Sequence, residues 1–229
     1  MKVEIVKAER LYLKVADQVA SLIRKGELKK NERLPSERDL AEMFGVSRPT
    51  IREAMIALEI SGMVDIRSGS GVYVKAVGNP MSILSDAAGP IEILEARMLI
   101  EAEAAALAAE RATSEELNLI KHYLDEIEDE NTRITDHELA DENFHLAIAT
   151  ASRNSALFAT IKHLWTLRKT TPIAKFMHEK LRTRGVKPVI DQHTMIFDAI
   201  ASGDPEAARR AMREHLQSVI DNVVDNEKL

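Results

Sequence analysis

The sequence predicts a mainly α-helical fold, with an N-terminal winged helix-turn-helix followed by a C-terminal antiparallel all-α bundle of six or seven helices. Apolar residues recur at helical spacing along most of the chain, whereas strand-like patterns occur only within 63–74. Glycines and prolines then mark a break between the two parts. We therefore expect a winged helix-turn-helix domain at 1–76, a linker at 77–90 and a helical domain at 91–229.

The first part of the chain is predicted to begin with three helices. Apolar residues form a helical stripe over Arg10–Arg24. Pro35-Ser36 opens a second helix, in which Ser36 is a good N-cap, and that helix closes near Gly45. A third helix spans Ser47–Ser61, with Pro49 in the first turn, where proline costs little. A short helix, a tight turn and a second helix form the pattern of a helix-turn-helix.

A β-hairpin and a run of helices are expected to follow. Met63–Arg67 and Val72–Val74 read as strands, and Ser68–Gly71 has the composition of the turn that joins them. Beyond the linker, helical segments are separated by short breaker sequences. These breakers are Ala112–Ser114, Asn131–Thr135, Ser152–Asn154, Thr171-Pro172, Gly185 and Ser202–Pro205. Short connections between helices favour antiparallel neighbours, and hence a bundle.

The charge is divided unevenly between the two parts. The whole chain has 31 Lys+Arg, 37 Asp+Glu and a formal net charge of −6. Residues 1–76 hold 14 basic and 11 acidic residues, a charge of +3, so the remainder holds 17 and 26, a charge of −9. A relatively basic N-terminal part suits a nucleic-acid partner.

Several classes of protein are disfavoured by composition. The absence of cysteine excludes a disulfide framework and a thiolate-ligated metal site. The N-terminus lacks the apolar run of a secretory signal, and no stretch approaches the length of a membrane span. We therefore expect a cytoplasmic protein that does not contact a membrane.

The second helix of the helix-turn-helix is expected to enter the DNA major groove with its N-terminus first. Hydroxyl groups at that end suit phosphate oxygens, and arginines suit the N7 and O6 edge of guanine. The spacing alone also fits a small helical bundle with surface arginines. The predicted DNA contacts are Arg38, Ser47, Arg48, Thr50 and Arg52, and the Ser68–Gly71 wing tip, which has little side-chain bulk, can lie against the duplex. Because one reading head makes few base contacts, we expect a homodimer on a pseudo-palindromic operator.

Four residues of the second part form a candidate metal site. Asp141 and His145 are four residues apart, which places them on one face of a helix. His193 and His215 each lie ten residues from the breaker at 203–205, so both stand about 15 Å from that turn in an antiparallel helix pair. A lone histidine is more often a surface or core group, so the site depends on all four converging. One carboxylate and three imidazoles suit zinc, with nickel and manganese as alternatives.

Two arginines of the second part are candidates for binding a carboxylate. Arg97 lies among apolar residues of the first bundle helix, and a core-facing arginine needs an anionic partner. Glu95 or Glu101 would instead make it an ordinary surface pair. Arg168 follows Trp165, which is interpreted as core packing, and its planar fork suits a carboxylate. The candidate effector contacts are Arg97, Arg168 and Asn154, which alternatively caps the helix after it.

The N-terminal part resembles the DNA-binding domain of GntR-family regulators. The resemblance runs from Leu11 to Val74 and is carried by LPSERDLAEMFGVSRPTIREAM and then GMVDIRSGSGVYV. It implies a sequence-specific winged helix-turn-helix. It also implies DNA contacts at the positions that match the family pattern, which are Arg38, Arg48, Thr50, Arg52 and Gly69.

The second part, from about Ile91 to Val224, resembles the FCD-type effector domain of the FadR subfamily. The resemblance rests on ILEARMLIEAEAAALAAERAT, ADENFHLAIATASRNSAL and DQHTMIFDAIASGDPEAARRAMREHL. It implies a metal site at Asp141, His145, His193 and His215 below the effector, and an effector carboxylate held by Arg97. Segments such as GPIEILEARMLIE and NSALFATIKHLWTLRK resemble hexuronate-utilisation repressors, which implies glucuronate, galacturonate or a derived keto-acid as effector.

The sequence thus favours a DNA-binding regulator, most naturally a repressor, rather than an enzyme. A regulator that senses an amino acid or a dicarboxylate is the first alternative. A metal-dependent hydrolase is the second, because three histidines and an aspartate with an open position can activate water. Against the hydrolase, no positioned general base is evident, and the N-terminal domain would have no role.

Overall fold

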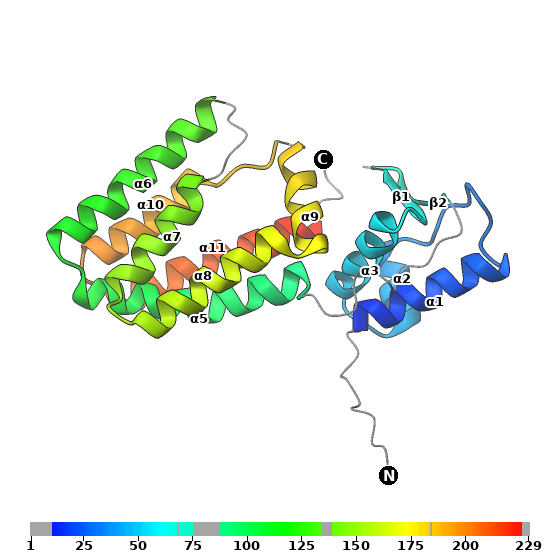
Figure 1. Ribbon diagram of the computed structural model, residues 1–229, viewed down its shortest axis with the longest axis horizontal. Helices are drawn as coiled ribbons and strands as arrows, with labels where there is room; N and C mark the ends of the chain where they lie inside the picture. The colour runs from blue at the N-terminus through cyan, green and yellow to red at the C-terminus, as the bar shows by residue number, and fades with distance from the viewer. Residues whose placement is uncertain (1–10, 68, 76–87, 134–138, 184, 226–229) are drawn as a thin grey trace, which may run out of the picture. The chain divides into compact units, whose positions relative to one another are not determined.

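The computed structural model describes residues 11–67, 69–75, 88–133, 139–183 and 185–225 (Figure 1). The chain divides into two compact units. One unit is Met1–Gly89 with Thr171–Met177 and Val223–Leu229, and the other is Pro90–Thr170 with His178–Asn222. The prediction of a mainly helical chain with one small sheet is confirmed. Within the described residues, no helix is long and apolar enough to cross a bilayer.

The first unit contains the three predicted helices and the hairpin. Its helices and strands are α1 Leu11–Lys25, α2 Glu37–Phe44, α3 Arg48–Ile60, β1 Val64–Arg67 and β2 Gly71–Val74. The core lies between α1 and α3, where Val15, Val19 and Ile51 are among the buried side chains. Apolar residues repeated every three to four positions along α1 supply one buried face. This core holds the helix-turn-helix in place.

Local hydrogen bonds set the ends of the two helix-turn-helix helices. The Ser36 side chain accepts from the Asp39 backbone N–H at 3.2 Å, and Ser47 accepts from the Thr50 backbone N–H at 3.3 Å. Both serines therefore satisfy an N–H group that the helix leaves unpaired. Gly45 ends α2 with a φ of 64°, in the left-handed region that glycine adopts without a steric penalty. The predicted Ser36 cap and the predicted turn are thus present, and Ser47 caps the helix that was expected to begin there.

The wing is an antiparallel pair of strands. Val64 pairs with Val74 at the open end, and Arg67 pairs with Gly71 next to the turn. Ser68, part of the predicted turn, lies outside the described residues. Arg33 forms an isolated antiparallel bridge to Tyr73, which ties the segment before α2 to the wing. The wing is therefore anchored to the helix-turn-helix by backbone pairing as well as by its buried valines.

The predicted linker at 77–90 lies mostly outside the described residues, and Pro90 already begins a helix. Seven described helices follow, which agrees with the predicted six or seven. They are α5 Pro90–Arg111, α6 Ser114–Arg133, α7 Leu139–Ala151, α8 Ser155–Thr170, α9 Pro172–Thr183, α10 Ile190–Ala201 and α11 Pro205–Asp225. Each break between described helices falls at or beside a predicted breaker.

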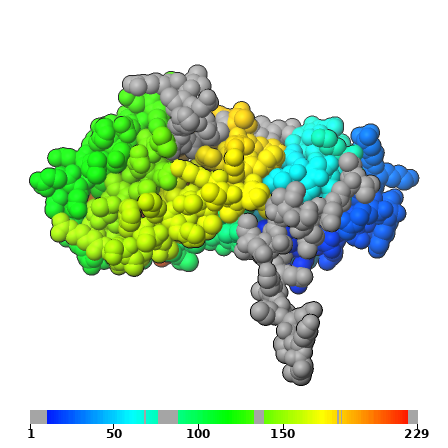
Figure 2. Space-filling view, viewed as in Figure 1, coloured from blue at the N-terminus to red at the C-terminus, as the bar shows by residue number. Residues whose placement is uncertain are grey.

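Helix α5 is central to the second unit, because it contacts α7, α8 and α10. Its buried face is rich in alanine, at positions 102, 104, 105, 106 and 108. Small side chains let neighbouring helices approach closely, since the distance between axes depends on the residues at the contact. In Figure 2, the side chains of α6, α7 and α8 (green to yellow) fill the spaces between the ribbons of Figure 1. Polar side chains that point inward from these helices are therefore enclosed.

Candidate functional site

The predicted DNA contacts cluster around the start of α3. Ser47 caps the helix, Arg48 is its first residue, and Thr50 lies in its first turn. The Ser47 and Thr50 hydroxyl oxygens are 2.8 Å apart, so the two side chains share a hydrogen bond. Helix N-termini attract phosphate because their free N–H groups and dipole are positive. The start of α3 thus has the chemistry of a phosphate-binding site.

Arg52, one turn further along α3, is already paired with a residue of α2. Its Nε donates to Glu37 Oε1 at 2.8 Å, and its Nη2 donates to Glu37 Oε2 at 2.6 Å. The two side chains are only 13% and 12% exposed. A bidentate pair with little exposure fixes the angle between α2 and α3. In this structure Arg52 is therefore a bridge within the helix-turn-helix, and reading a base requires it to exchange that partner.

Two other predicted contacts lie on exposed elements. Arg38 is an exposed residue of the first turn of α2, and Gly69 is an exposed residue of the wing tip. Near that tip, Arg67 pairs with Asp65 at 2.8 Å, and its guanidinium carbon lies 4.4 Å from the centre of the Tyr73 ring. The wing therefore carries a positioned cation that the sequence analysis did not single out.

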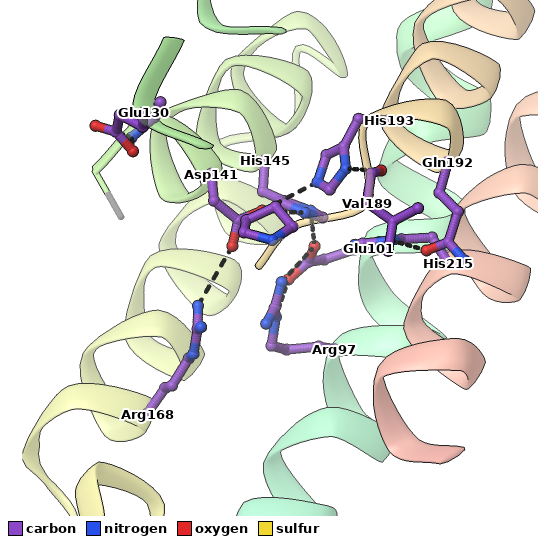
Figure 3. A network of polar contacts seen from close by, with 12 residues as sticks. Arg97, Glu101, Glu130, Asp141, His145, Arg168, Val189, Gln192, His193 and His215 are labelled. Carbon is purple, nitrogen blue, oxygen red and sulfur yellow. Dashed lines mark hydrogen bonds and ion pairs between the residues drawn. The ribbon is translucent and has the colours of Figure 1, made fainter. Parts of the chain in front are cut away.

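The four predicted metal ligands come together in the second unit (Figure 3). One ligand atom from each of His145, His193 and His215 lies within 4.8 Å of the others. Asp141 Oδ1 is 3.0 Å from His193 Nε2 and 3.7 Å from His145 Nε2. All four residues are buried, with at most 8% of their surface exposed. Helices α7, α10 and α11 supply them, as the sequence spacing predicted.

Each imidazole has an outer partner at Nδ1, which leaves Nε2 to face the centre. His193 Nδ1 donates to the Val189 carbonyl at 2.8 Å, and His215 Nδ1 donates to Gln192 Oε1 at 3.0 Å. His145 Nδ1 is 2.5 Å from Glu101 Oε2, an ion-pair contact whose angles are not those of a hydrogen bond. Outer partners of this kind orient metal-binding imidazoles.

Charge and burial set the protonation of the cluster. Burial alone would raise the pKa of Asp141, but its hydrogen bond to His193 and the nearby His145 hold that pKa well below the usual value. Burial lowers the pKa of His215 well below its usual value, and the neighbouring histidines add to the effect. An ionised carboxylate and a neutral imidazole are the forms that bind metals.

The cluster fits a divalent metal ion. It offers three imidazoles and one carboxylate, a donor set that suits zinc, nickel or manganese. His145 Nε2 is buried and makes no hydrogen bond within the part of the chain that is described. A buried polar atom without a partner is costly, so a ligand at this position removes a penalty. A metal ion at this position would give the unpaired nitrogen a partner, so the residues present fit such an ion.

Arg97 is buried as predicted, but its partner is not at the surface. Its Nε donates to Glu101 Oε1 at 2.6 Å, and the two side chains are 4% and 2% exposed. Although burial tends to raise the pKa of Glu101, Arg97 and His145 lower it to about 2. Glu101 therefore joins Arg97 to a candidate metal ligand. The surface pair considered from the sequence is in fact a buried ion pair.

Arg168 approaches the same cluster from α8. Its Nη1 lies 3.5 Å from Asp141 Oδ2, and its Nη2 donates to His178 Nδ1 at 2.9 Å. Asn154 lies elsewhere: its Oδ1 accepts from the Ala156 and Leu157 N–H groups and caps α8. Fourteen residues separate Asn154 from Arg168 on this helix, which is about 20 Å. The structure therefore places Asn154 as a cap, away from the cluster.

Two further side chains support the cluster, Glu101 and Gln192; the sequence indicated Glu101 only as a surface partner of Arg97, and it gave no role to Gln192. Glu101 lies four residues after Arg97 on α5, and Gln192 directly precedes His193 on α10. The Arg-x-x-x-Glu spacing was a signal for the pair on α5. Its contact with His145, however, depends on the packing of α5 against α7. No spacing within a helix indicates that packing.

Two known protein families match the two parts of the chain. Residues 11–74 match "Bacterial regulatory proteins, gntR family", and residues 92–218 match the FCD domain. The chain is 35% identical over 223 residues to the Exu regulon transcriptional regulator of Escherichia coli strain K12. That alignment covers 94% of this chain and 85% of the relative.

Another relative and a solved structure agree with this result. The putative L-lactate dehydrogenase operon regulatory protein of Escherichia coli strain K12 is 35% identical over 230 residues, covering 94% of this chain and 87% of the relative. The crystal structure of a GntR-family transcriptional regulator from Pseudomonas syringae pv. tomato is similar, with a TM-score of 0.51 and 21% identity. It covers 94% of this chain and 85% of that one, and it supports the fold alone.

Proposed function

Because the chain belongs to the GntR family of bacterial regulatory proteins and carries an FCD domain, we propose that it is a repressor released from operator DNA by a hexuronate or related sugar acid. The family and the relatives above are transcriptional regulators, not enzymes. A GntR domain implies operator binding, and an FCD domain implies a small-molecule effector. One observation carries the proposal: three imidazoles, a carboxylate and two arginines meet in one buried region.

The side chains of the cluster suit a hydroxy-carboxylate. When bound by His145, His193, His215 and Asp141, a divalent ion supplies a positive centre that accepts carboxylate and hydroxyl oxygens. Arg168 donates to His178 Nδ1 at 2.9 Å and lies 3.5 Å from Asp141 Oδ2, so an effector carboxylate would have to replace the longer Asp141 contact. Arg97 gives Nε and Nη2 to Glu101, which leaves Nη1 as the nitrogen for a further acceptor.

Enclosure of the cluster supports a switch. Because the candidate metal-binding residues are at most 8% exposed, entry of an acid requires the surrounding helices to rearrange. A ligand shifts such an equilibrium only by its differential affinity for the two arrangements. We expect the acid and operator DNA to weaken each other's binding, with a coupling free energy of about 1–3 kcal/mol, which is typical of coupled sites.

The DNA-binding part of the proposal concerns the start of α3. Ser47 and Thr50 contact phosphate, Arg48 reads a base edge, and Arg38 and the wing at Gly69 extend the contact. Two reading heads in a homodimer bind a pseudo-palindrome, because one head alone offers little specificity. Operator DNA is cytoplasmic in bacteria, which is where we place the protein.

The relatives also favour a second candidate effector. The relative named for an L-lactate dehydrogenase operon is as similar to this chain as the Exu regulon regulator, at 35% identity. A smaller 2-hydroxy acid such as lactate offers the same carboxylate and hydroxyl to a metal and an arginine. Amino acids and dicarboxylates keep the carboxylate but lack that pairing of donors. The ligand panel must therefore contain all four classes.

Isothermal titration calorimetry with glucuronate, galacturonate, lactate, glutamate and succinate tests the effector class. We expect a uronate to bind most tightly and to release operator DNA in a gel-shift assay. Arg168→Ala should weaken uronate binding and leave DNA binding intact. Arg209→Ala is the matched control, because Arg209 also pairs with a carboxylate, Glu103, on the second unit's surface. If none of the uronates binds the parent at millimolar concentration, the proposed effector class is wrong.

Elemental analysis tests the metal. The purified protein should contain about one divalent ion per chain, which His193→Ala/His215→Ala should lose because several ligands must converge. His122→Ala is the control, since the His122 side chain is 60% exposed and pairs with Glu126 at the surface. Full occupancy in the double variant would exclude the proposed ligands.

A further inference from the structure

Trp165 has a buried hydrogen-bond donor that nothing in the described chain accepts. The residue is fully enclosed, with 0% of its surface exposed. Its indole Nε1 has no hydrogen-bond partner among the residues that the structure describes. Buried tryptophan N–H groups usually find an acceptor, and an unpaired one costs the free energy of its lost hydration. A hydrogen-bond acceptor that is not one of the described residues, such as a bound ligand or a water molecule, would remove this cost.

The Trp165 ring lies where the candidate effector contacts meet. The guanidinium carbon of Arg97 is 4.0 Å from the ring centre, and that of Arg168 is 4.8 Å away. The His145 ring centre lies 5.4 Å from the same ring. One aromatic side chain thus touches both arginines and a candidate metal ligand. Cations are attracted to the faces of indole rings, so Trp165 helps hold both guanidinium groups in this region.

The charges around the ring favour an anionic acceptor. Two guanidinium groups repel one another, and Glu101 and Asp141 each offset one of them. The Arg168 contact is the longer and the more exposed of the two, at 3.5 Å with 22% of the arginine side chain accessible. A carboxylate entering beside Arg168 would meet a cation and an unpaired N–H donor together. Apolar packing alone needs neither the indole nitrogen nor the two cations.

We propose that Trp165 is an effector-binding residue, whose indole Nε1–H donates a hydrogen bond to an oxygen of the bound sugar acid while its ring positions Arg97 and Arg168. This inference rests on the proposed function and assigns to Trp165 a role beyond core packing. A water molecule at the same nitrogen is the competing occupant, because buried waters pair with otherwise unsatisfied groups. The two occupants predict different results when the nitrogen is removed.

Trp165→Phe tests the proposal, because it keeps an aromatic ring and deletes the N–H. We expect uronate affinity, measured by calorimetry, to fall about 10- to 100-fold, the range for loss of a hydrogen bond to a charged oxygen. Metal content should remain at the parental level. Thermal stability without the acid, followed by circular dichroism, should fall only modestly, since the smaller ring leaves a cavity but an unpaired donor has been removed. A loss of uronate affinity larger than the loss of stability in the free state is not expected of a residue that only packs.

Phe158→Leu is the matched control, since Phe158 lies on the same helix and packs against the same buried residues as Trp165. It should lower the melting temperature and leave uronate affinity unchanged. If Trp165→Phe fails to fold, the parent provides a second measurement, because Trp165 is the single tryptophan of the chain. Its emission should change on titration with glucuronate or galacturonate in metal-loaded protein.

Three results would overturn the proposal. Equal uronate affinity in Trp165→Phe and the parent would mean that water or packing explains the indole. Unchanged Trp165 emission at saturating uronate would mean that Trp165 does not contact the bound acid. If the parent binds no sugar acid, the proposed effector class fails and this inference fails with it. In the first two cases the parent still binds the acid, so the proposed function stands.

Discussion

Replacing Glu101 by glutamine should destabilise the second unit strongly. Glu101 is 2% exposed, it accepts from Arg97 at 2.6 Å, and it lies 2.5 Å from His145. Glutamine is nearly the same size, so the change removes charge and leaves little cavity. Breaking a buried ion pair by removing one partner costs about 3–5 kcal/mol, because the remaining charge is buried without compensation. The lowering of the Glu101 pKa from 4.5 to about 2 corresponds to about 3 kcal/mol, the same order.

The assay is thermal unfolding of metal-free protein, followed by the fluorescence of Trp165. Because Trp165 is the only tryptophan and lies beside Arg97, its signal reports on this region. For a chain of this length each kcal/mol corresponds to about 2–4 °C, so Glu101→Gln should lower the melting temperature by about 6–20 °C. Chelation before measurement removes any metal contribution to the transition.

The same helix offers a matched control in Glu103. Glu103 pairs with Arg209 through both carboxylate oxygens, but the two side chains are 46% and 27% exposed. Glu103→Gln should therefore cost no more than about 1 kcal/mol, since exposed pairs are screened by solvent. Equal shifts of the melting temperature in the two variants would mean that burial does not determine the strength of these ion pairs.

Three further predictions concern other sites. Arg52→Ala should weaken operator binding and also lower the stability of the first unit, because Glu37 loses its bidentate partner. Arg48→Ala should weaken operator binding by about 1–3 kcal/mol if Arg48 reads a base. Gel shift and calorimetric melting separate the two effects. Arg97→Ala should leave operator binding intact and remove release by uronate in the same gel-shift assay, and normal release would contradict its role. The backbone N–H of the Thr113 cap and then Arg153 lower the Glu116 pKa below 4.5, so its contribution is present above pH 4.5 and is lost as pH falls through the folded pKa. Urea unfolding at pH 6 and pH 3 should show a smaller effect of Glu116→Gln at the lower pH.

The sequence predicted those features that local rules determine. Ser36 and Ser47 cap helices because a serine before a helical stripe can accept from an N–H within the next turn. The hairpin follows from two strand patterns around a glycine-containing turn. Asn154 was compatible with either a cap or an effector contact, and the cap is what the structure contains. Each of these depends only on residues close together in the chain.

The candidate metal site was also predictable, but its surroundings were not. Asp141 and His145 share a helix face, and His193 and His215 lie at equal distances from one turn, so spacing indicated two pairs, and the resemblance to FCD-type domains joined them into one site. The contacts Glu101–His145 and Arg52–Glu37 join different helices, 44 and 15 residues apart. These contacts depend on which helix faces pack together. Hydrophobic periodicity predicts which face of a helix is buried, but it does not predict which other helix packs against that face.

In the proposed switch, a sugar acid bound near the cluster lowers the affinity of the protein for operator DNA. Calorimetric titration of the preferred uronate into the protein alone, and into the protein saturated with operator DNA, measures the coupling directly. By linkage, DNA must weaken acid binding by the factor through which the acid weakens DNA binding, about 5- to 150-fold. We expect a higher Kd in the presence of operator and an equal shift in the reciprocal gel-shift titration. The same Kd with and without operator would show that the two binding events are independent.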